Sequence, residues 1–260
     1  MKNKALLVGI NKYPDPQNEL RGCINDILDM DHFITETNKV YAKQNVKMLT
    51  DRDATKKGIV TQLKWLLEGA QAGDQLLFHY SGHGAQMSTM HPKEELDGSD
   101  EIICPYDFDW TKETTLRDKE FAQIFSAIPK GVHFVWISDS CHAEDLSRDV
   151  SVDKNCTYRF FNGVNKSSSQ QLNFIPEIIT RPLNGVLLSA CASEQLSADA
   201  YIEKRFNGAF THYLLKNLTK ASPNQTLQQT IHFVHSDLAM NGYDQRPQVE
   251  GLLATSSFFL

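Results

Sequence analysis

The chain has 260 residues, a length that one α/β domain can accommodate, and its 26 basic and 32 acidic side chains give a net charge of −6. This balance lacks the large basic patch that phosphate binding requires, so nucleic acid is excluded as the expected substrate. No secretory leader is evident, and no apolar stretch approaches the roughly 20 residues needed to cross a bilayer. The five cysteines are scattered, and their odd number argues against a closed disulfide framework. A cytoplasmic protein without a membrane anchor is expected.

The first half of the chain alternates short apolar runs with amphipathic segments, a pattern typical of a mostly parallel sheet. Residues 5–10 predict a central strand that ends in turn-forming residues, and the apolar spacing that starts at Cys23 predicts a helix. A strand near residues 46–49 and a helix over residues 55–69 continue the alternation. The later predicted strands cover residues 75–80, 101–104, 133–138 and 185–190.

Residues 148–181 interrupt this alternation. They include a serine-rich stretch and several asparagines with little periodicity, so a long exposed loop is expected. This loop divides a single domain, residues 1–260, into a larger part, residues 1–147, and a smaller part, residues 182–260. In the smaller part we expect two helices and a last strand, at residues 208–218, 227–240 and 252–260.

Two short motifs, each at the end of an apolar run, carry groups suited to nucleophilic catalysis. They are Ser81-Gly82-His83-Gly84 and Asp139-Ser140-Cys141-His142. Because ligands bind beyond the carboxyl ends of parallel strands, both motifs are expected at the same edge of the sheet. A thiolate needs an imidazole within hydrogen-bond reach, so we predict Cys141 as the nucleophile and His83 as its base. The amides of Gly84 and Cys141 are the predicted donors of an oxyanion hole.

Plainer explanations exist for each of these residues alone. A free cysteine is usually a small core residue, and a histidine after a strand is often a satisfied surface or core group. The shared position of Cys141 and His83 beyond two strands favours catalysis over both explanations. His142 points away from its neighbour on an extended turn, which favours a structural or rim position. Gln195 and Asp199 fall near the expected cleft, where substrate binding and ordinary loop polarity explain them equally well.

A metal site made of histidines was also considered. Its ligands would be His79, His83 and His91. The spacing of four between the first two suits one face of a helix, but these residues lie in and after a predicted strand. Metal ligation by this group is therefore disfavoured.

Taken in order, the motifs resemble those of the caspase-fold cysteine peptidases of clan CD, in particular the metacaspase-like proteins of bacteria. The matching stretches span nearly the whole chain: residues 5–10, 20–26, 79–84, 97–101, 139–142 and 208–211. The resemblance implies an α/β fold, a caspase-like three-layer sandwich with a mostly parallel six-stranded sheet and helices on both faces. It also implies a peptidase C14 enzyme with His83 as general base and acid, Cys141 as nucleophile, and an acyl-enzyme that water hydrolyses.

The resemblance further implies a specificity pocket lined by Asp26 and Asp139, with Ser81 and Cys23 beside them. Carboxylates at the base of a narrow pocket favour arginine or lysine before the cut bond. Arg21 complicates this assignment because true caspases bind aspartate through arginines, so a protease with aspartate specificity stays an alternative. The plainer explanations are a solvated helix face for Asp26 and a turn-capping carboxylate for Asp139.

Calcium is the one cofactor that the resemblance suggests, since many metacaspases bind it through four aspartates. Asp100 and Asp118 match two of these positions. Lys119 stands where an adjacent aspartate is expected, and the fourth position falls on Asp145 or Arg148. A cation in a site built for oxygen ligands opposes calcium binding. We therefore expect activity without calcium and no required cofactor.

Caspase relatives are often cut between their larger and smaller parts, where residues 148–181 lie. The basic residues of this loop are candidate self-cleavage sites, although an exposed loop also carries such charges for solubility. They are Arg148, Lys154, Arg159, Lys166 and Arg181. The expected partners are protein or peptide substrates and a regulatory sensor protein, in a bacterial stress or defence response. The alternative from another class is a catalytically silent caspase-like scaffold or binding module.

Overall fold

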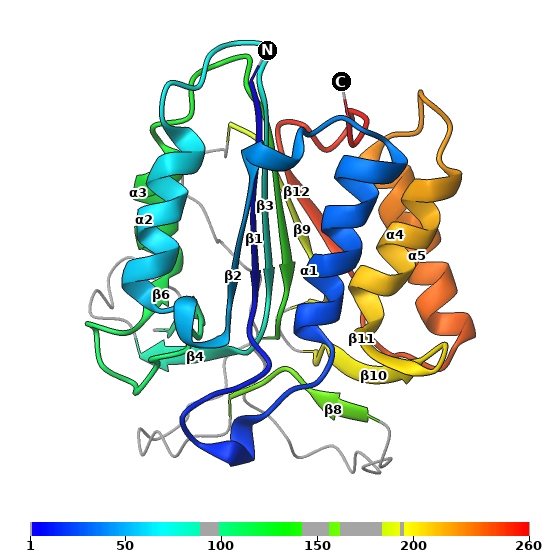
Figure 1. Ribbon diagram of the computed structural model, residues 1–260. Helices are drawn as coiled ribbons and strands as arrows, with labels where there is room; N and C mark the ends of the chain where they lie inside the picture. Colours follow the sequence, from blue (N-terminus) through cyan, green and yellow to red (C-terminus); the bar gives the residue numbers. More distant parts are fainter. Residues whose placement is uncertain (1, 89–98, 142–155, 162–183, 193–194, 260) are drawn as a thin grey trace.

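The computed structural model describes residues 2–88, 99–141, 156–161, 184–192 and 195–259 (Figure 1). Its centre is one sheet of six strands: β1 (Asn3–Gly9), β2 (Val46–Thr50), β3 (Gln75–Ser81), β7 (His133–Asp139), β9 (Val186–Ser189) and β12 (Gln248–Gly251). In space the strands run in the order β12-β9-β7-β3-β1-β2, and only β12, at one edge, is antiparallel to its neighbour. The predicted mostly parallel six-stranded sheet is confirmed.

Helices cover both faces of this sheet, which confirms the three-layer α/β sandwich (Figure 1). One face carries α1 (Cys23–His32), α4 (Ala209–Lys220) and α5 (Leu227–Met240), and the other carries α2 (Lys56–Leu67) and α3 (Asp118–Phe125). Short helical turns complete the set: η1 (Pro16–Asn18), η2 (Phe33–Thr37), η3 (Lys43–Asn45) and η4 (Asp51–Asp53). Within the described ranges, no helix has the length and apolar character that crossing a bilayer requires.

The alternation of side chains along β1 explains why both faces are covered. Successive residues of a strand point to opposite faces. Leu6 and Val8 therefore pack in the core under α2 and α3, while Ala5 and Leu7 pack in the core under α1, α4 and α5. All four are fully buried. A central strand with two buried faces reads as the continuous apolar run found in the sequence.

Two small antiparallel sheets flank the carboxyl edge of the central sheet. One consists of β4 (Gly84–Ser88), β5 (Ser99–Ile103) and β6 (Leu116–Arg117), and the other of β8 (Cys156–Tyr158), β10 (Ala198–Ile202) and β11 (Arg205–Gly208). The strand predicted at residues 101–104 therefore exists, but its place in the parallel alternation was wrong. It pairs antiparallel with β4 rather than entering the central sheet.

The strand predicted at residues 252–260 is also wrong, because the last strand is β12 and ends before them. Gly251 has φ +117°, a backbone conformation that ends the extended run. Ala254 and Phe258 then cap the core of α1, α4 and α5. This packing, and not strand pairing, explains the apolar composition of the carboxyl-terminal segment.

The expected exposed loop over residues 148–181 is wrong for the part that the structure describes. Residues 156–158 form β8, and the side chains of Arg159 and Phe161 are buried. Residues 142–155 and 162–183 lie outside the described residues, so the boundaries placed at 147/148 and 181/182 stay predictions.

Candidate active site

Adjacent parallel strands bring His83 and Cys141 to the same edge of the sheet. β3 and β7 pair in register, with Ser81 opposite Asp139 at their carboxyl ends. His83 and Cys141 each follow two residues later, so the 58 residues between them in the sequence do not separate them in the register. Both side chains are buried, His83 with 2% exposure and Cys141 with none. The structure thus places both residues at the edge where the sequence predicted a catalytic site.

The hydrogen bond of His83 fixes its tautomer. Its Nε2 lies 2.9 Å from the carbonyl oxygen of Asn18, and a carbonyl can only accept, so Nε2 carries the proton. Nδ1 is then an unprotonated acceptor, and it is buried without a hydrogen-bond partner among the described residues. Burial is the main reason that the pKa of His83 falls to about 4, which the carbonyls of Asn18 and Arg159 only partly offset. The ring is a neutral base.

The thiol of Cys141 is also neutral in this arrangement. Burial raises its pKa to about 12, although the backbone of Ser197, the Arg159 charge and the Arg159 backbone act in the opposite direction. The His83 imidazole and the Cys141 thiol are therefore both uncharged before a substrate reacts. The main chain of Arg159 lies next to Cys141, because the Cys141 amide donates to the Arg159 carbonyl oxygen at 3.4 Å.

The two predicted oxyanion donors converge on one oxygen atom. The amide of Gly84 donates to the carbonyl oxygen of Arg159 at 3.0 Å, and the amide of Cys141 donates to the same oxygen at 3.4 Å. Donors aimed at one carbonyl oxygen beside a thiol are the arrangement that stabilises a tetrahedral oxyanion. The peptide carbonyl of Arg159 thus stands where the carbonyl of a substrate would stand.

The side chain of Arg159 fills a buried acidic pocket. Its guanidinium lies 2.6 Å from Asp26 Oδ2, 3.1 Å from Asp139 Oδ1 and 3.1 Å from Asp199 Oδ1. It also donates to Ser81 Oγ at 2.8 Å. All of these side chains are fully buried. One buried guanidinium is thus surrounded by three carboxylates, which make charge-assisted hydrogen bonds with it.

Main-chain donors hold all three of these carboxylates in place independently of Arg159. Gly208 N donates to Asp26 Oδ1 at 2.9 Å, and Gly22 N donates to Asp199 Oδ1 at 2.9 Å. The third carboxylate, Asp139, accepts hydrogen bonds from the amide and hydroxyl of Thr211 and from Ser197 Oγ. The pocket is therefore built by the fold and is not shaped around Arg159 alone.

Glycine provides the space for the guanidinium. A Cβ added to Gly208 would lie 2.3 Å from Asp139 Oδ2 and 2.6 Å from Arg159 Nη1. These distances are far below ordinary contact. Gly208 has φ −66°, so its role here is to leave room and not to supply an unusual backbone conformation.

Most of the predicted pocket residues come together here. Asp26 and Asp139 contact the guanidinium directly, and neither is a solvated helix face or an exposed turn cap. Ser81 contacts it as well, and Cys23 is buried beside it, with a thiol pKa that is raised by burial and lowered by the Arg159 charge. Arg21 does not enter the pocket, because its exposed side chain lies over the ring of Phe206.

Sequence reasoning underrated Asp199 and did not place Arg159. Asp199 lies in β10, opposite Thr157 of β8, and only this long-range pairing brings its carboxylate to the pocket. Gln195 has a different part: its amide donates to Asp244 O at 2.6 Å and its Oε1 accepts from Arg246 N at 2.8 Å, which ties down a loop. The one available signal for Asp199 was its position after the strand predicted at residues 185–190, near the expected cleft.

Among the residues whose side chains the structure describes, no group of three or more histidine, cysteine, aspartate or glutamate side chains is arranged to hold an ion. Asp100 lies in β5 and Asp118 begins α3, where Lys119 directly follows it, and the expected activity without calcium stays a prediction. The remaining candidates, His91, Asp145 and Arg148, and also His142, lie outside the described residues.

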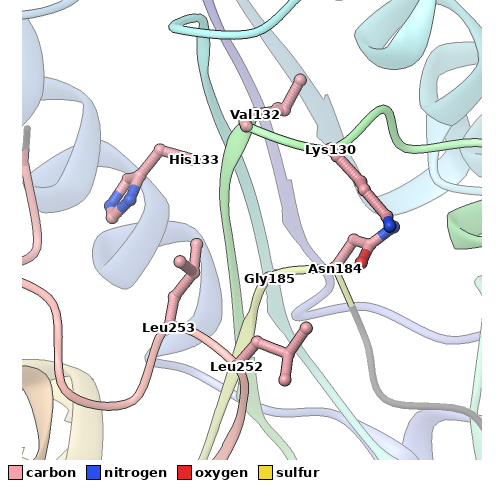
Figure 2. Close-up of a pocket in the computed structure, with 8 residues that line it drawn as sticks. Lys130, Val132, His133, Asn184, Gly185, Leu252 and Leu253 are labelled. Atoms are coloured by element: carbon pink, nitrogen blue, oxygen red, sulfur yellow. The ribbon is translucent and has the colours of Figure 1, made fainter.

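An open pocket of about 310 Å³ lies at the opposite edge of the sheet (Figure 2). Val132 and His133 at the start of β7, Gly185 before β9, and Leu252 and Leu253 line it. The ring of His133 bonds to Phe258 O at 3.0 Å through Nε2. Since it lies at the amino ends of the strands, it is separate from the candidate active site.

Comparison with known proteins agrees with this geometry. Residues 3–148, which include both His83 and Cys141, match the model of the metacaspase, peptidase C14 domain. Metacaspase-1 of Pyricularia oryzae is 30% identical over 95% of this chain and 71% of its own length. Metacaspase-1B of Neurospora crassa is 30% identical over 95% of this chain and 66% of its own length.

Solved structures share the fold. A structural-genomics target protein of Geobacter sulfurreducens superposes with a TM-score of 0.70 at 24% identity, covering 96% of this chain and 92% of that one. Caspase-1 of Spodoptera frugiperda superposes with a TM-score of 0.63 at 12% identity, covering 96% of this chain and 86% of that one. With its caspase fold and the match to the peptidase C14 model, the chain belongs to the metacaspase family of cysteine peptidases.

Proposed function

We propose that this cysteine peptidase cuts protein chains after arginine or lysine, with His83 and Cys141 as its catalytic dyad. One observation carries the proposal: Arg159 has its side chain among three buried carboxylates while its carbonyl oxygen accepts from both predicted oxyanion donors. A substrate residue before the cut bond must satisfy both requirements at once. The spacing between pocket and oxyanion donors therefore fits an arginine.

The proposed reaction uses the groups at the sheet edge in sequence. Nδ1 of His83 takes the thiol proton of Cys141 as the sulfur attacks the carbonyl carbon, and the amides of Gly84 and Cys141 stabilise the oxyanion. The imidazolium then protonates the leaving amine, and the C–N bond breaks to give a thioester. Nδ1 next deprotonates a water molecule, which hydrolyses the thioester and restores the thiol. The Asn18 carbonyl keeps the ring in the required tautomer throughout.

The charges of the pocket support basic over acidic specificity. Asp26, Asp139 and Asp199 are buried, and a substrate aspartate would place another carboxylate among them without a cation. The guanidinium makes several charge-assisted hydrogen bonds at once, which a lysine ammonium can only partly reproduce. We expect arginine to be preferred over lysine and both to be strongly preferred over aspartate.

The activity also fits processing of the chain itself, at one of its basic residues between the larger and smaller parts. The remaining expectations are a cytoplasmic setting, a bacterial stress or defence response, and a regulatory sensor protein. They stay predictions that follow from the resemblance to the family.

Hydrolysis of short fluorogenic peptides ending in Arg, Lys or Asp tests the proposed activity. The purified protein is assayed before and after prolonged incubation, beside Cys141→Ala and the matched control Cys104→Ala, whose buried thiol takes no part in the dyad. Hydrolysis after Arg and Lys by the wild type and the control, and not by Cys141→Ala, is the expected result. A wild type that hydrolyses none of the three peptides would favour the silent scaffold instead.

A further inference from the structure

Residues 156–159 occupy the active site as an added β-strand. β8 pairs antiparallel with β10, with Cys156 opposite Ala200, Thr157 opposite Asp199 and Tyr158 opposite Ala198. Arg159 extends the pairing, because its amide donates to Ser197 O at 3.0 Å. Strand addition of this kind is a general mode of peptide recognition, in which the main chain supplies affinity and side-chain pockets supply specificity. The segment is thus bound in the manner of a peptide ligand.

After Arg159, the next two residues, Phe160 and Phe161, are held by main-chain contacts with Gly84. Phe161 N donates to Gly84 O at 3.1 Å, and Gly84 forms a parallel bridge with Phe160. Gly84 therefore holds the segment on both sides of Phe160: its amide binds the carbonyl of the Arg159–Phe160 bond, and its carbonyl binds the amide of Phe161. The bond between Arg159 and Phe160 is fixed in register with the oxyanion donors.

A pocket of aromatic side chains holds Phe161. Its ring centroid lies 4.9 Å from Phe108, 5.5 Å from Tyr13 and 6.1 Å from Trp110, each in an edge-to-face arrangement. The same ring lies 5.7 Å from His83, so the pocket adjoins the catalytic imidazole. Phe161 keeps 7% of its exposure. Edge-to-face pairs of this kind add to the stabilisation that burial alone provides.

The backbone of this aromatic pocket is constrained. Trp110 has φ +67°, a left-handed conformation that is costly for a residue with a side chain. The neighbouring carboxylate of Asp109 accepts from Thr111 N at 3.0 Å, from Thr111 Oγ1 at 2.6 Å and from Thr114 Oγ1 at 2.5 Å. These bonds hold the turn that presents the indole. The conformation is consistent with a pocket whose shape is fixed by the fold.

Self-cleavage between the larger and smaller parts is already expected from the resemblance to the family, and until it occurs Cys156–Phe161 fills the site. We propose that the bond the enzyme cuts in itself is Arg159–Phe160, and that the pocket of Tyr13, Phe108 and Trp110 selects an aromatic residue at the second position after the cut. This inference rests on the proposed function. The blocking follows from burial, since the segment leaves the dyad and the acidic pocket without access to another substrate.

The chemical step consumes one water molecule. The Cys141 sulfur forms a bond to the Arg159 carbonyl carbon, the bond from that carbon to the Phe160 nitrogen breaks, and His83 delivers the proton that leaves Phe160 as a free amine. Water then replaces sulfur and leaves Arg159 as a carboxylic acid. After this cut the strand that ends at Arg159 keeps its pairing with β10 but is no longer joined to Phe160, so it can leave the site. Departure of Arg159 opens the acidic pocket to solvent and to arginine residues of other chains.

Mapping the fragments by intact mass and amino-terminal sequencing tests the cut. Wild type is expected to yield one fragment ending at Arg159 and one beginning at Phe160, with a rate that does not depend on protein concentration. Cys141→Ala and Arg159→Gln should stay uncut, while Arg159→Lys, which keeps the charge in the acidic pocket, should be cut at the same bond more slowly. The loop variants Arg148→Gln and Arg181→Gln are matched controls that should not move the cut. A cut at a bond other than Arg159–Phe160, at the same place in wild type and in the Arg159 variants, would overturn the proposal.

A second measurement tests the aromatic pocket. Processed wild type is assayed on quenched peptides with the sequence Cys-Thr-Tyr-Arg-Phe-Phe and with its last phenylalanine changed to alanine. Because an aromatic side chain loses its buried contacts, kcat/KM should fall by about fivefold or more. Trp110→Ala should remove most of this difference between the two peptides. Equal rates on both peptides would contradict an aromatic subsite.

The blocking role predicts an effect of Phe161→Ala before processing. Because the variant holds Cys156–Phe161 less tightly in the site, its initial rate on a short fluorogenic Arg peptide should be about fivefold higher than that of wild type. Phe233→Ala, at an exposed phenylalanine of α5, is the matched control and should leave that rate unchanged. Hydrolysis of the Arg peptide with no cut at Arg159 and no effect of Phe161→Ala would end this proposal and leave the proposed function intact. Failure of every variant to hydrolyse the peptide would instead end the proposed function.

Discussion

The guanidinium of Arg159 lies 2.6 Å from the carboxylate of Asp26, although 133 residues separate them in the chain. The ion pair joins the residue that follows β8 to helix α1. Both side chains are fully buried, so the fold gives this ion pair a defined place and surrounds it with further carboxylates. Under the proposed function, the same pair marks the pocket that receives the arginine of a substrate.

Removing one pocket charge should impair cleavage after arginine. Asp26→Asn keeps the size of the side chain and its bond to Gly208, but it removes the charge at the shortest contact with the guanidinium. A hydrogen bond to a charged group contributes about 1.5–3 kcal/mol, so kcat/KM for an Arg peptide should fall about 10- to 100-fold. Asp29→Asn, which alters a partly exposed carboxylate paired with Arg205, is the matched control. Equal losses in both variants would argue against a specificity pocket at Asp26.

Filling the pocket should have a comparable effect. Gly208→Ala introduces a methyl group that would meet both Asp139 and the guanidinium at far less than contact distance. The backbone at φ −66° tolerates alanine, so the cost falls on the pocket and on substrate binding. KM for an Arg peptide should rise at least tenfold, because a charged hydrogen bond is displaced. Thermal unfolding measured in parallel separates this effect from a loss of folding, and an unchanged KM would contradict the assigned pocket.

As the pH is lowered, the folded protein should start to lose stability before the pH reaches the range in which carboxylates titrate. Burial lowers the pKa of His79 and of His83 to about 4, from 6.5 in an unfolded chain, so the unfolded state takes up protons first as pH falls. Each of the two histidines should lower the free energy of unfolding by about 2 kcal/mol as the pH falls from 7 to 5. Stability is full above pH 6.5 and declines through this window. Urea unfolding at several pH values measures the slope.

The substitution His79→Leu isolates one of these two contributions. His79 is buried against Thr211 in the core beneath α4 and takes no part in the proposed dyad. The variant should lose roughly half of the pH dependence between pH 7 and pH 5. His232→Leu, at an exposed position of α5, serves as the matched control. An unchanged slope in His79→Leu would show that its imidazole is protonated in the folded protein.

Local patterns were sufficient to predict five of the six strands of the central sheet, all except β12. The buried runs of β1, β3 and β7 leave a continuous apolar signal, and their polar ends place His83 and Cys141 at one edge. The helix predicted at residues 227–240 coincides with α5, whose start Thr226 and Gln229 cap reciprocally. Where the pattern misled, at residues 252–260, apolar side chains cap a core without forming a strand.

The pocket could be predicted only in part. Asp26 and Asp139 were identified through the resemblance to the family, but the positions of Asp199 and Arg159 depend on the pairing of β8 with β10. Such pairing joins segments 42 residues apart at Thr157 and Asp199, and no local periodicity encodes it. The loop between the two parts looked exposed because its composition is polar. Burial of Arg159 reverses that expectation, since the carboxylates that compensate its charge come from other segments.

Calcium should not be required for cleavage. Lys119 directly follows Asp118 at the start of α3, and a cation there opposes the binding of a divalent ion through oxygen ligands. The rate on an Arg peptide should change by less than about twofold between excess EGTA and millimolar calcium chloride, within the range of ordinary ionic effects. Lys119→Asp tests whether the missing ligand is the reason. A strict need for calcium in the wild type would contradict this prediction.

The most direct test of the account is a positional peptide library, scored for the residue before the bond that the processed enzyme cuts. A guanidinium pocket built from Asp26, Asp139 and Asp199 beside a His83–Cys141 dyad predicts arginine first, lysine second and no aspartate, with all cutting lost in Cys141→Ala. Enrichment of aspartate, or cutting that persists unchanged in Cys141→Ala, would contradict it.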